Sequence, residues 1–567
     1  MPAGRPSVPL GHRRWPLAVV VAALLTQMAV AMGATAARQS PTSDEPVYLV
    51  SGVEYLLVHE LRHNPEHPPL GKLIIGAGAV LTGPHLDAGH GTQTQAGRRL
   101  LYGSGNDAQR LLLAARLPVI VLTVLFGLVV FAFARDLAGT AGGLTALTLY
   151  AFAPGLIAHG SLATLDVPVA GFLVTSVWLA WRARRRPRLY VPLSGAAVGA
   201  ALATKMSALP AVPMLMTLAA MSVWAARRSR RAAVGAAAGA AAPAVVVVWA
   251  SYLVVDPRLQ WTTPADLPDV GGLRGLAVGL MPFPEPFRDG MRIQFGLEQL
   301  QWGGFLFGRT YRGSLWYYLP AALLVKTPLG MLVMWAAGIA AMAALPRLRP
   351  AAPYVLGAAA VLLAVAMTGS RDFGIRYVLF IHMFLAVAAA GTLLVRRRWA
   401  KAVAGALVLF AAVSSLRTFP FYLPYSNEAF GGPSKTHRHL HDSNVDWGQD
   451  LWRLADWLRE CHPGERVFLV YKGGGVPAAY GIDATDPRKV PPERVHGLLV
   501  VSNSWIAMRH PRLVPLIRSS ERIGEVGHSI TIFRRPPCAG SAEPGRGVHC
   551  GGPAMPGNED VVAPTPR

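Results

Sequence analysis

The sequence contains eleven apolar blocks, most of them about twenty residues long and separated by short polar stretches. They lie near 16–36, 111–134, 137–158, 162–181, 189–204, 208–226, 232–254, 319–345, 351–368, 377–395 and 400–417. About twenty apolar residues are what a helix needs to cross a bilayer, whereas the core of a soluble protein needs no such blocks. Hydrophobic residues make up 52% of the chain and charged residues only 15%. We therefore predict an all-α polytopic membrane protein with about eleven transmembrane helices, which excludes an ordinary cytoplasmic protein and a disordered one.

The first block could also be read as a cleaved signal peptide, because Ala-rich residues follow it. Its apolar stretch is long for the hydrophobic region of such a peptide. We therefore predict that this helix is retained.

The basic residues between the blocks predict the orientation, because Lys and Arg remain on the cytoplasmic side of a membrane. With the N-terminus inside, the inner segments carry 19 basic residues and a single acidic one, Asp136. The reverse orientation would invert this pattern at every loop. We predict a multi-pass protein of the plasma (inner) membrane with a cytoplasmic N-terminus. The net charge of +23 follows the same loops, so membrane lipids are expected partners and nucleic acid is not.

The chain divides into three regions. Residues 1–417 form the predicted transmembrane domain, with large outer loops at 37–110 and 255–318. Residues 418–535 have soluble patterning and predict a small extracytoplasmic α/β domain, with one helical face (Leu451, Leu454, Ala455 and Leu458) and strands at 467–470, 498–501 and 530–533. Residues 536–567 are rich in Pro and Gly and predict a disordered tail.

Acidic residues near the outer ends of the predicted spans are the first functional candidates, because charge is costly there. Asp44 and Glu45 follow the first span, and Asp166 lies about one turn inside the fourth. A carboxylate at this level could take the proton of an acceptor hydroxyl. Helix capping is the alternative for Asp44, with Pro46 close behind it, and also for Asp166, although Thr164 could serve there instead.

Cationic residues gather at the same outer ends: Lys72, Arg116, Lys205, Lys326, Arg371 and Arg376. Such a cluster suits a phosphate or diphosphate whose lipid tail stays in the bilayer. Lys326 lies about six residues into its span, so it could instead extend its side chain back to the interface. Trp316, Tyr317 and Tyr318 are interpreted as interfacial belt residues, with sugar stacking as the alternative.

Several short motifs occur in a defined order along residues 16–535. HPPLGK at 67–72 follows Asp44 and Glu45, AHGSLATLD occupies 158–166, KTP occupies 326–328, and DSNVDWGQDL occupies 442–451. In this order and spacing the chain resembles protein O-mannosyltransferases and lipid A aminoarabinose transferases, which are GT-C glycosyltransferases of family 39 that use polyprenyl-phosphate sugars. The stretch 425–432 departs from the family's usual pattern.

The resemblance implies a GT-C-like fold and inverting transfer of a hexose, such as mannose, from a polyprenyl-phosphate donor to a hydroxyl acceptor on the extracytoplasmic face. It implies that Asp44 is the general base and that Glu45 and Asp166 are supporting site residues. The expected ligands of the donor phosphate are Lys72, Arg116 and Lys205, to which we add Lys326 and Arg376, with His67 as a further site residue. The acceptor is expected to be a protein, a lipid or a glycan. No sugar-binding repeats of the eukaryotic enzymes are evident, so protein acceptors stay open.

Two other functions share parts of this pattern. A transporter or flippase of lipid-linked sugars predicts internal repeats and charges near the midplane or on both faces, and neither is evident. An oligosaccharide polymerase or ligase shares the topology, and only the motif order argues against it. No His/Cys cluster with zinc spacing occurs, so no cofactor is predicted; His63, Glu66 and His67 are a weak candidate for a divalent metal.

Overall fold

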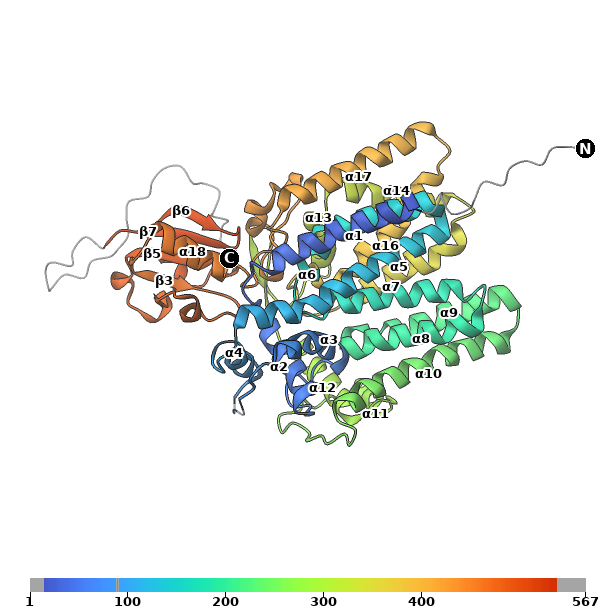
Figure 1. The fold of residues 1–567 in the computed structure, drawn as a ribbon, viewed down its shortest axis with the longest axis horizontal. Coiled ribbons are helices and arrows are strands. Elements are labelled where there is room, and N and C mark those ends of the chain that lie inside the picture. Colours follow the sequence, from blue (N-terminus) through green and yellow to red (C-terminus); the bar gives the residue numbers. More distant parts are fainter. Residues whose placement is uncertain (1–14, 88, 90, 538–567) are drawn as a thin grey trace, which may run out of the picture.

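The computed structural model describes residues 15–87, 89 and 91–537. The helices form an elongated bundle, and a sheet built from the C-terminal part of the chain lies at one end of it (Figure 1). The short helices that follow α1 (Trp15–Ala36) lie at this same end, and the first described residues lie at the other. Residues 538–567, which make up nearly all of the predicted tail, lie outside the described residues.

Six helical segments in the described part of the chain are long and apolar enough to cross a membrane. They are α1, α5 (Ala108–Ala151), Met206–Arg227 with α9 (Ala211–Arg227), α10 (Arg230–Val255), Arg349–Ala366 with α15 (Ala358–Ala366), and α17 (Arg398–Thr418). Three shorter apolar segments accompany them: Pro69–Thr82, Leu329–Ala344 and Phe380–Leu394. The chain is therefore a mostly helical, multi-pass membrane protein, as predicted.

The blocks at 111–134 and 137–158 correspond to α5, which consists of two helical parts separated at Gly139, where φ is 74°. The two parts fold back on each other, since the Tyr150 hydroxyl donates to the Thr123 carbonyl oxygen at 2.6 Å. The predicted block at 319–345 differs from the structure, because it is broken into α13 (Tyr318–Lys326) and α14 (Leu329–Ala344). Pro328 lies at that break, and its missing N–H and its ring cannot continue a helix. Hydropathy alone does not detect this break.

The other helices have the following bounds: α2 (Glu45–Leu57), α3 (Pro69–Ala79), α4 (Gln93–Tyr102), α6 (Pro154–Gly160), α7 (Asp166–Arg182), α8 (Pro187–Thr204), α11 (Gly272–Gly279), α12 (Glu285–Gln299), α16 (Phe380–Ala389), α18 (Leu451–Cys461), α19 (Asn503–Ala507) and α20 (Leu513–Arg518). Strands β1 (Gly303–Leu306) and β2 (Arg309–Arg312) pair antiparallel as a hairpin in the second large loop.

The C-terminal part contains a five-stranded mixed sheet in the order β4-β3-β5-β7-β6. Its strands are β3 (Val467–Val470), β4 (Ala484–Thr485), β5 (Gly497–Ser502), β6 (Glu521–Val526) and β7 (Ile530–Arg535). β3 and β5 are parallel, whereas β7 runs antiparallel to both of its neighbours. Helix α18 packs on one face through its predicted apolar side, and α20 packs on the other. The three predicted strands and this helical face are confirmed.

Helices α2 and α3 touch through their backbones, and this contact holds α2 in place beneath the outer end of the bundle. A Cβ on Gly52 would lie 2.3 Å from the carbonyl oxygen of Lys72, and a Cβ on Gly76 would lie 2.4 Å from that of Gly52. No side chain fits at either position. Since α2 begins directly after Asp44, the contact also fixes where that carboxylate stands.

We expect Gly52→Ala to lower thermal stability, because the added methyl group would push α2 and α3 apart. Overpacking of this kind costs about 1–3 kcal/mol. Gly405→Ala in α17 is the matched control, since a Cβ there meets no atom within 4 Å and replacing an interior helical Gly by Ala is favourable. Thermal unfolding of both purified variants in detergent measures the difference. Equal transition temperatures would contradict the close contact.

Candidate active site

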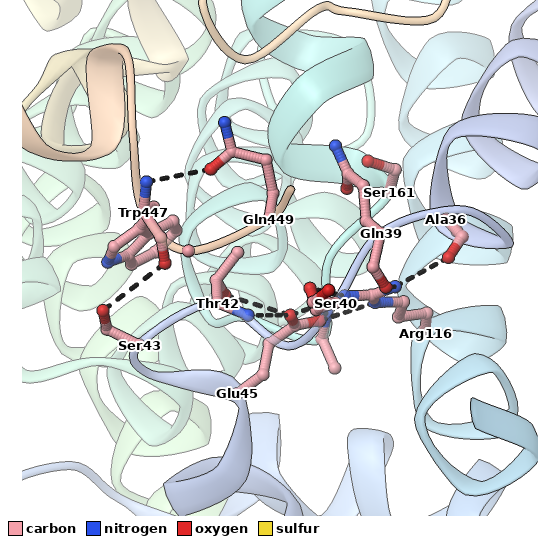
Figure 2. A network of polar contacts seen from close by, with 12 residues as sticks. Ala36, Gln39, Ser40, Thr42, Ser43, Glu45, Arg116, Ser161, Trp447 and Gln449 are labelled. Atoms are coloured by element: carbon pink, nitrogen blue, oxygen red, sulfur yellow. Dashed lines mark hydrogen bonds and ion pairs between the residues drawn. The ribbon is translucent and has the colours of Figure 1, made fainter. Parts of the chain in front are cut away.

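Glu45 and Arg116 form a fully buried ion pair at the end of the bundle where α2 follows α1. The Arg116 guanidinium donates from Nε and Nη2 to the two carboxylate oxygens, each at 2.7 Å. Its other N–H groups donate to the carbonyl oxygens of Ala36, Gln39 and Ser40 at 2.7, 3.0 and 3.1 Å. Figure 2 shows this network. All five N–H groups of Arg116 are therefore used within the protein.

The Glu45 carboxylate is equally occupied. It accepts hydrogen bonds from the backbone N–H of Thr42 at 2.8 Å, the Thr42 hydroxyl at 3.0 Å and the backbone N–H of Ala163 at 2.8 Å. Burial raises its pKa, but the charge of Arg116 and these hydrogen bonds outweigh burial and leave the pKa below its ordinary value. The pair ties the end of α1, the start of α2, α5 and the turn before α7 together. Arg116, predicted as a phosphate ligand, has no free N–H and instead holds the loop that carries Asp44.

Asp44 lies at the N-terminus of α2, but its side chain makes no capping hydrogen bond. Its Oδ2 atom accepts from Arg376 Nη1 at 2.6 Å, and the Tyr48 hydroxyl lies 3.5 Å away. The Asp44 side chain is 29% exposed, whereas that of Arg376 is 9% exposed. The Asp44 side chain therefore does not cap α2; its carboxylate is paired with a cation and is partly exposed.

A second ion pair joins Asp166, the first residue of α7, to Lys205, which follows α8. Lys205 Nζ donates to Asp166 Oδ1 at 2.5 Å, and both side chains are nearly buried. The ring of Tyr377 lies between the two pairs: its centroid is 5.2 Å from Lys205 Nζ and 5.0 Å from Arg376 Cζ. Four predicted site residues therefore belong to one continuous cluster, in which Asp44 contacts Arg376, Tyr377 separates the cations, and Lys205 contacts Asp166.

Lys72 and Lys326 are buried and bonded to backbone and side-chain oxygens. Lys72 Nζ donates to the Tyr55 hydroxyl and to the carbonyl oxygens of Asn64 and His67 at 2.8, 2.6 and 2.7 Å, which uses all three N–H groups. Lys326 Nζ donates to the carbonyl oxygens of Leu423 and Asn444 at 2.6 and 2.5 Å. Lys326 therefore does not extend to the interface, and both lysines hold chain segments together.

Both cations of the cluster have N–H groups that no atom of the described residues uses. Arg376 Nε is buried and has no hydrogen-bond partner in the described part of the chain. Lys205 uses one of its three N–H groups on Asp166. A phosphate could therefore be met by Arg376 and Lys205 without breaking a hydrogen bond of either residue.

His67 lies beside this cluster. Its ring centroid is 6.3 Å from that of Tyr48, and its Nδ1 atom is 3.5 Å from Gln294 Nε2. Burial, together with the charges of Lys205 and Lys72, holds the pKa of His67 well below its ordinary value. The imidazole is thus neutral at physiological pH and cannot add positive charge for a phosphate.

The weak metal candidate does not converge on one point. His63 Nδ1 lies 2.6 Å from Glu54 Oε2, and Glu66 Oε1 accepts from Gln93 Nε2 at 3.1 Å. Over residues 15–87, 89 and 91–537, no group of three or more His, Cys, Asp or Glu side chains could hold a metal ion. His63 and Glu66 are thus each engaged by a different partner.

The segment 442–450, part of the motif before α18, reaches back to the candidate site. The Trp447 carbonyl oxygen accepts from the backbone N–H of Ser43 at 3.0 Å and from the Ser43 hydroxyl at 3.4 Å (Figure 2). The Ser40 N–H donates to the Gln449 carbonyl oxygen at 3.0 Å. The Trp447 ring centroid is 4.4 Å from Arg376 Cζ, a cation–π distance. This segment therefore contacts both the residue before Asp44 and the cation that pairs with it. The sequence motif marked the segment but gave Trp447 no role.

Asn444 fixes the other side of Arg376. Its Oδ1 atom accepts from the backbone N–H of Ile375 at 3.1 Å, and its Nδ2 atom donates to the Tyr318 hydroxyl at 3.0 Å. Gly374 has φ 152°, and a Cβ there would lie 2.4 Å from the Ser443 hydroxyl oxygen. Tyr318 is buried here, whereas the neighbouring Trp316 is exposed. Of the predicted belt residues, Tyr318 is thus an interior residue that bonds to Asn444.

We expect Arg116→Met to destabilise the protein strongly, because it leaves the Glu45 carboxylate buried without its partner. Breaking a buried pair in this way costs about 3–5 kcal/mol. Arg459→Met is the control, since Arg459 and Asp456 form an exposed pair on α18, for which about 0–1 kcal/mol is expected. Unfolding of both variants in a detergent titration provides the comparison, and similar midpoints would show that the Glu45 pair is not the constraint inferred here.

The shifted pKa of Asp446 predicts that the stability of the protein depends on pH. Burial raises its pKa from 3.8 to about 7, although Ser504 and Gly448 donate backbone N–H groups to it at 3.2 and 3.3 Å. The folded state thus binds the Asp446 proton more tightly than the unfolded state. The contribution of this proton to the free energy of unfolding is complete below about pH 4 and is lost as pH rises through about 7. Between pH 5 and 8 the melting temperature of Asp446→Asn should fall less than that of the wild type. Asp456→Asn on the exposed surface should follow the wild type; parallel curves for Asp446→Asn would refute the prediction.

Comparison with known proteins gives one family match. Residues 24–255, less than half of the chain, match the family described as dolichyl-phosphate-mannose-protein mannosyltransferase. No curated protein matches the chain.

Three solved structures illustrate the similarity. ArnT from Cupriavidus metallidurans bound to undecaprenyl phosphate is 17% identical, with 93% of this chain and 99% of that chain covered and a TM-score of 0.48. The Saccharomyces cerevisiae Pmt1-Pmt2 complex bound to the sugar donor is 16% identical (53% and 39% covered, TM-score 0.36). The Archaeoglobus fulgidus oligosaccharyltransferase AglB in complex with an inhibitory peptide and a dolichol-phosphate is 13% identical (80% and 59% covered, TM-score 0.40).

The matched segment contains most of the site residues predicted from the sequence. It includes Asp44, Glu45, His67, Lys72, Arg116, Asp166 and Lys205, whereas Lys326, Arg376 and the segment 442–450 lie beyond it. Over this segment the chain resembles the GT-C glycosyltransferases of the O-mannosyltransferase type.

Proposed function

We propose that this protein transfers a sugar from a polyprenyl-phosphate donor to a hydroxyl acceptor on the extracytoplasmic side of the membrane. The observation that carries the proposal is the cluster at the outer end of the bundle, where the partly exposed Asp44 carboxylate contacts Arg376, and Arg376 and Lys205 flank Tyr377. The match of residues 24–255 supports the donor class, since that family is described by its dolichyl-phosphate-mannose donor.

The reaction needs a base and a place for negative charge. Asp44 takes the proton of the acceptor hydroxyl, whose oxygen attacks the anomeric carbon of the sugar as the bond to the lipid phosphate breaks, with inversion at that carbon. The departing phosphate carries the electron pair away. Arg376 Nε and the unused N–H groups of Lys205 are the donors available to stabilise it.

In this proposal the remaining predicted residues hold the reacting residues and the surrounding loops in place. Asp166 holds Lys205 beside Tyr377, and the Glu45–Arg116 pair holds the chain immediately before and after Asp44. Lys72 and Lys326, predicted as phosphate ligands, hold the loops around the cluster. This assignment keeps Arg376 and Lys205 as the phosphate ligands and gives the other three cations structural roles.

The charge pattern supports the proposed orientation. The 19 basic residues of the inner segments favour a cytoplasmic N-terminus in the plasma (inner) membrane, with the cluster and the C-terminal sheet outside. The sugar is proposed to be a hexose such as mannose, and the acceptor a secreted protein, a lipid or a cell-envelope glycan.

We expect Asp44→Asn to lower transfer at least 100-fold while expression and membrane insertion stay intact, because the amide cannot take the hydroxyl proton. The assay uses purified protein in lipid, a panel of radiolabelled polyprenyl-phosphate hexoses, and a cell-envelope extract as acceptor. Asp456→Asn on the exposed face of α18 is the control and should transfer at the wild-type rate.

Two results would contradict these assignments separately. Wild-type transfer by Asp44→Asn would remove Asp44 from the role of base. Absence of transfer from every donor, combined with movement of the labelled lipid between leaflets, would replace the transferase by a transporter of lipid-linked sugars.

A further inference from the structure

A basic cavity lies at the end of the bundle opposite the Asp44 cluster. It has a volume of about 460 Å³, opens between α5 and α7, and is lined by Phe131, Ala132, Arg135, Asp136, Arg182 and Arg185. Three of these six residues are arginines and one is acidic. The proposed transfer reaction uses none of them.

The position of the cavity along α5 places it at a membrane interface. Arg116 and Arg135 are 19 residues apart on this helix, which corresponds to about 29 Å at a rise of ~1.5 Å per residue. The hydrocarbon core of a bilayer is about 30 Å thick. With Arg116 at the outer interface, Arg135 therefore reaches the opposite one. Helix α5 begins near the C-terminal sheet and runs toward the other end of the bundle (Figure 1).

On one side of the cavity, the charge of Arg182 is neutralised by Asp136. Arg182 donates to both carboxylate oxygens of Asp136, from Nε at 2.8 Å and Nη2 at 3.1 Å. Trp178 Nε1 donates to the same carboxylate at 3.0 Å, and the Arg182 guanidinium lies 4.7 Å from the Trp178 ring centroid. Asp136 is thus fully engaged by Arg182 and Trp178 and leaves the other arginines uncompensated.

The other two arginines carry free charge. The side chains of Arg135 and Arg185 form no ion pair or hydrogen bond with any of the described residues, and both residues are exposed. Two guanidinium groups without a protein counter-charge at one cavity are able to bind an anion, and their planar N–H groups match the oxygens of a phosphate.

The apolar part of the lining indicates which anion this is. Phe131 and Ala132 lie one turn before Arg135, toward the membrane interior, while Trp178 and Trp181 lie near the end of α7, as interfacial aromatic residues do. Basic groups above an apolar wall at an interface suit a lipid headgroup whose acyl chains continue into the bilayer. We propose that this cavity binds the headgroup phosphate of an anionic phospholipid.

Native mass spectrometry of the purified full-length protein tests the proposal with phosphatidylglycerol as the probe. The double variant Arg135→Gln/Arg185→Gln removes the free charges but keeps the Asp136–Arg182 pair. Arg227→Gln/Arg230→Gln is the matched control, because it removes the same charge from exposed residues between α9 and α10. We expect the affinity for the most tightly retained phosphatidylglycerol to fall about tenfold or more in the first variant only.

Thermal unfolding supplies an independent readout. Added phosphatidylglycerol should raise the melting temperature of the wild type and the control variant, but not that of Arg135→Gln/Arg185→Gln. Equal retention of lipid in both variants would overturn the proposal, as would equal stabilisation by phosphatidylcholine. Stabilisation by inorganic phosphate alone, abolished by the same double variant, would instead identify a site for a free anion and would also overturn it.

Discussion

The buried ion pair between Glu45 and Arg116 is the constraint on which the candidate site depends. Two charges removed from water are costly unless every donor and acceptor finds a partner. Here the guanidinium bonds to the carboxylate and to three carbonyl oxygens, while the carboxylate also receives N–H groups from two separate segments. The pair can thus persist only when four parts of the chain have come together. Asp44 immediately precedes Glu45, so the carboxylate that we propose as the base takes its position from this requirement.

The same cluster depends on residues that are far apart in the chain. Asp44 and Arg376 are separated by 332 positions, and Ser43 and Trp447 by 404. The candidate site therefore needs α2, α7, the segment around Arg376 and the region before α18 to be folded at the same time. The C-terminal sheet is joined to the site through residues 442–450, and it cannot be regarded as an independent appendage.

The sequence predicted the features that depend on local composition. Apolar blocks predicted the helices, and the residues flanking them predicted which carboxylates and cations lie at the outer end. It could not predict the break at Pro328, because hydropathy looks the same whether a helix ends or continues. Nor could it separate the cations by role. Arg116 and Arg376 are alike in sequence, and the oxygens that use every N–H of Arg116 belong to Glu45 and to the chain around the end of α1, 71 to 80 positions away. Which N–H groups remain free to bind a ligand depends on the folded structure, because the fold decides which of them already have partners within the protein.

The contact between Gly52 and Gly76 has a consequence for how ligands reach the cluster. Side chains normally lie between two packed helices and allow small shifts by changing rotamers. Here the backbones of the two helices are in direct contact. At this contact no layer of side chains separates α2 from α3, so a shift of α2 relative to α3 would bring backbone atoms into collision. Room for a bulky acceptor beside Asp44 would then have to come from side chains on other elements near Arg376, such as Tyr377 and Trp447.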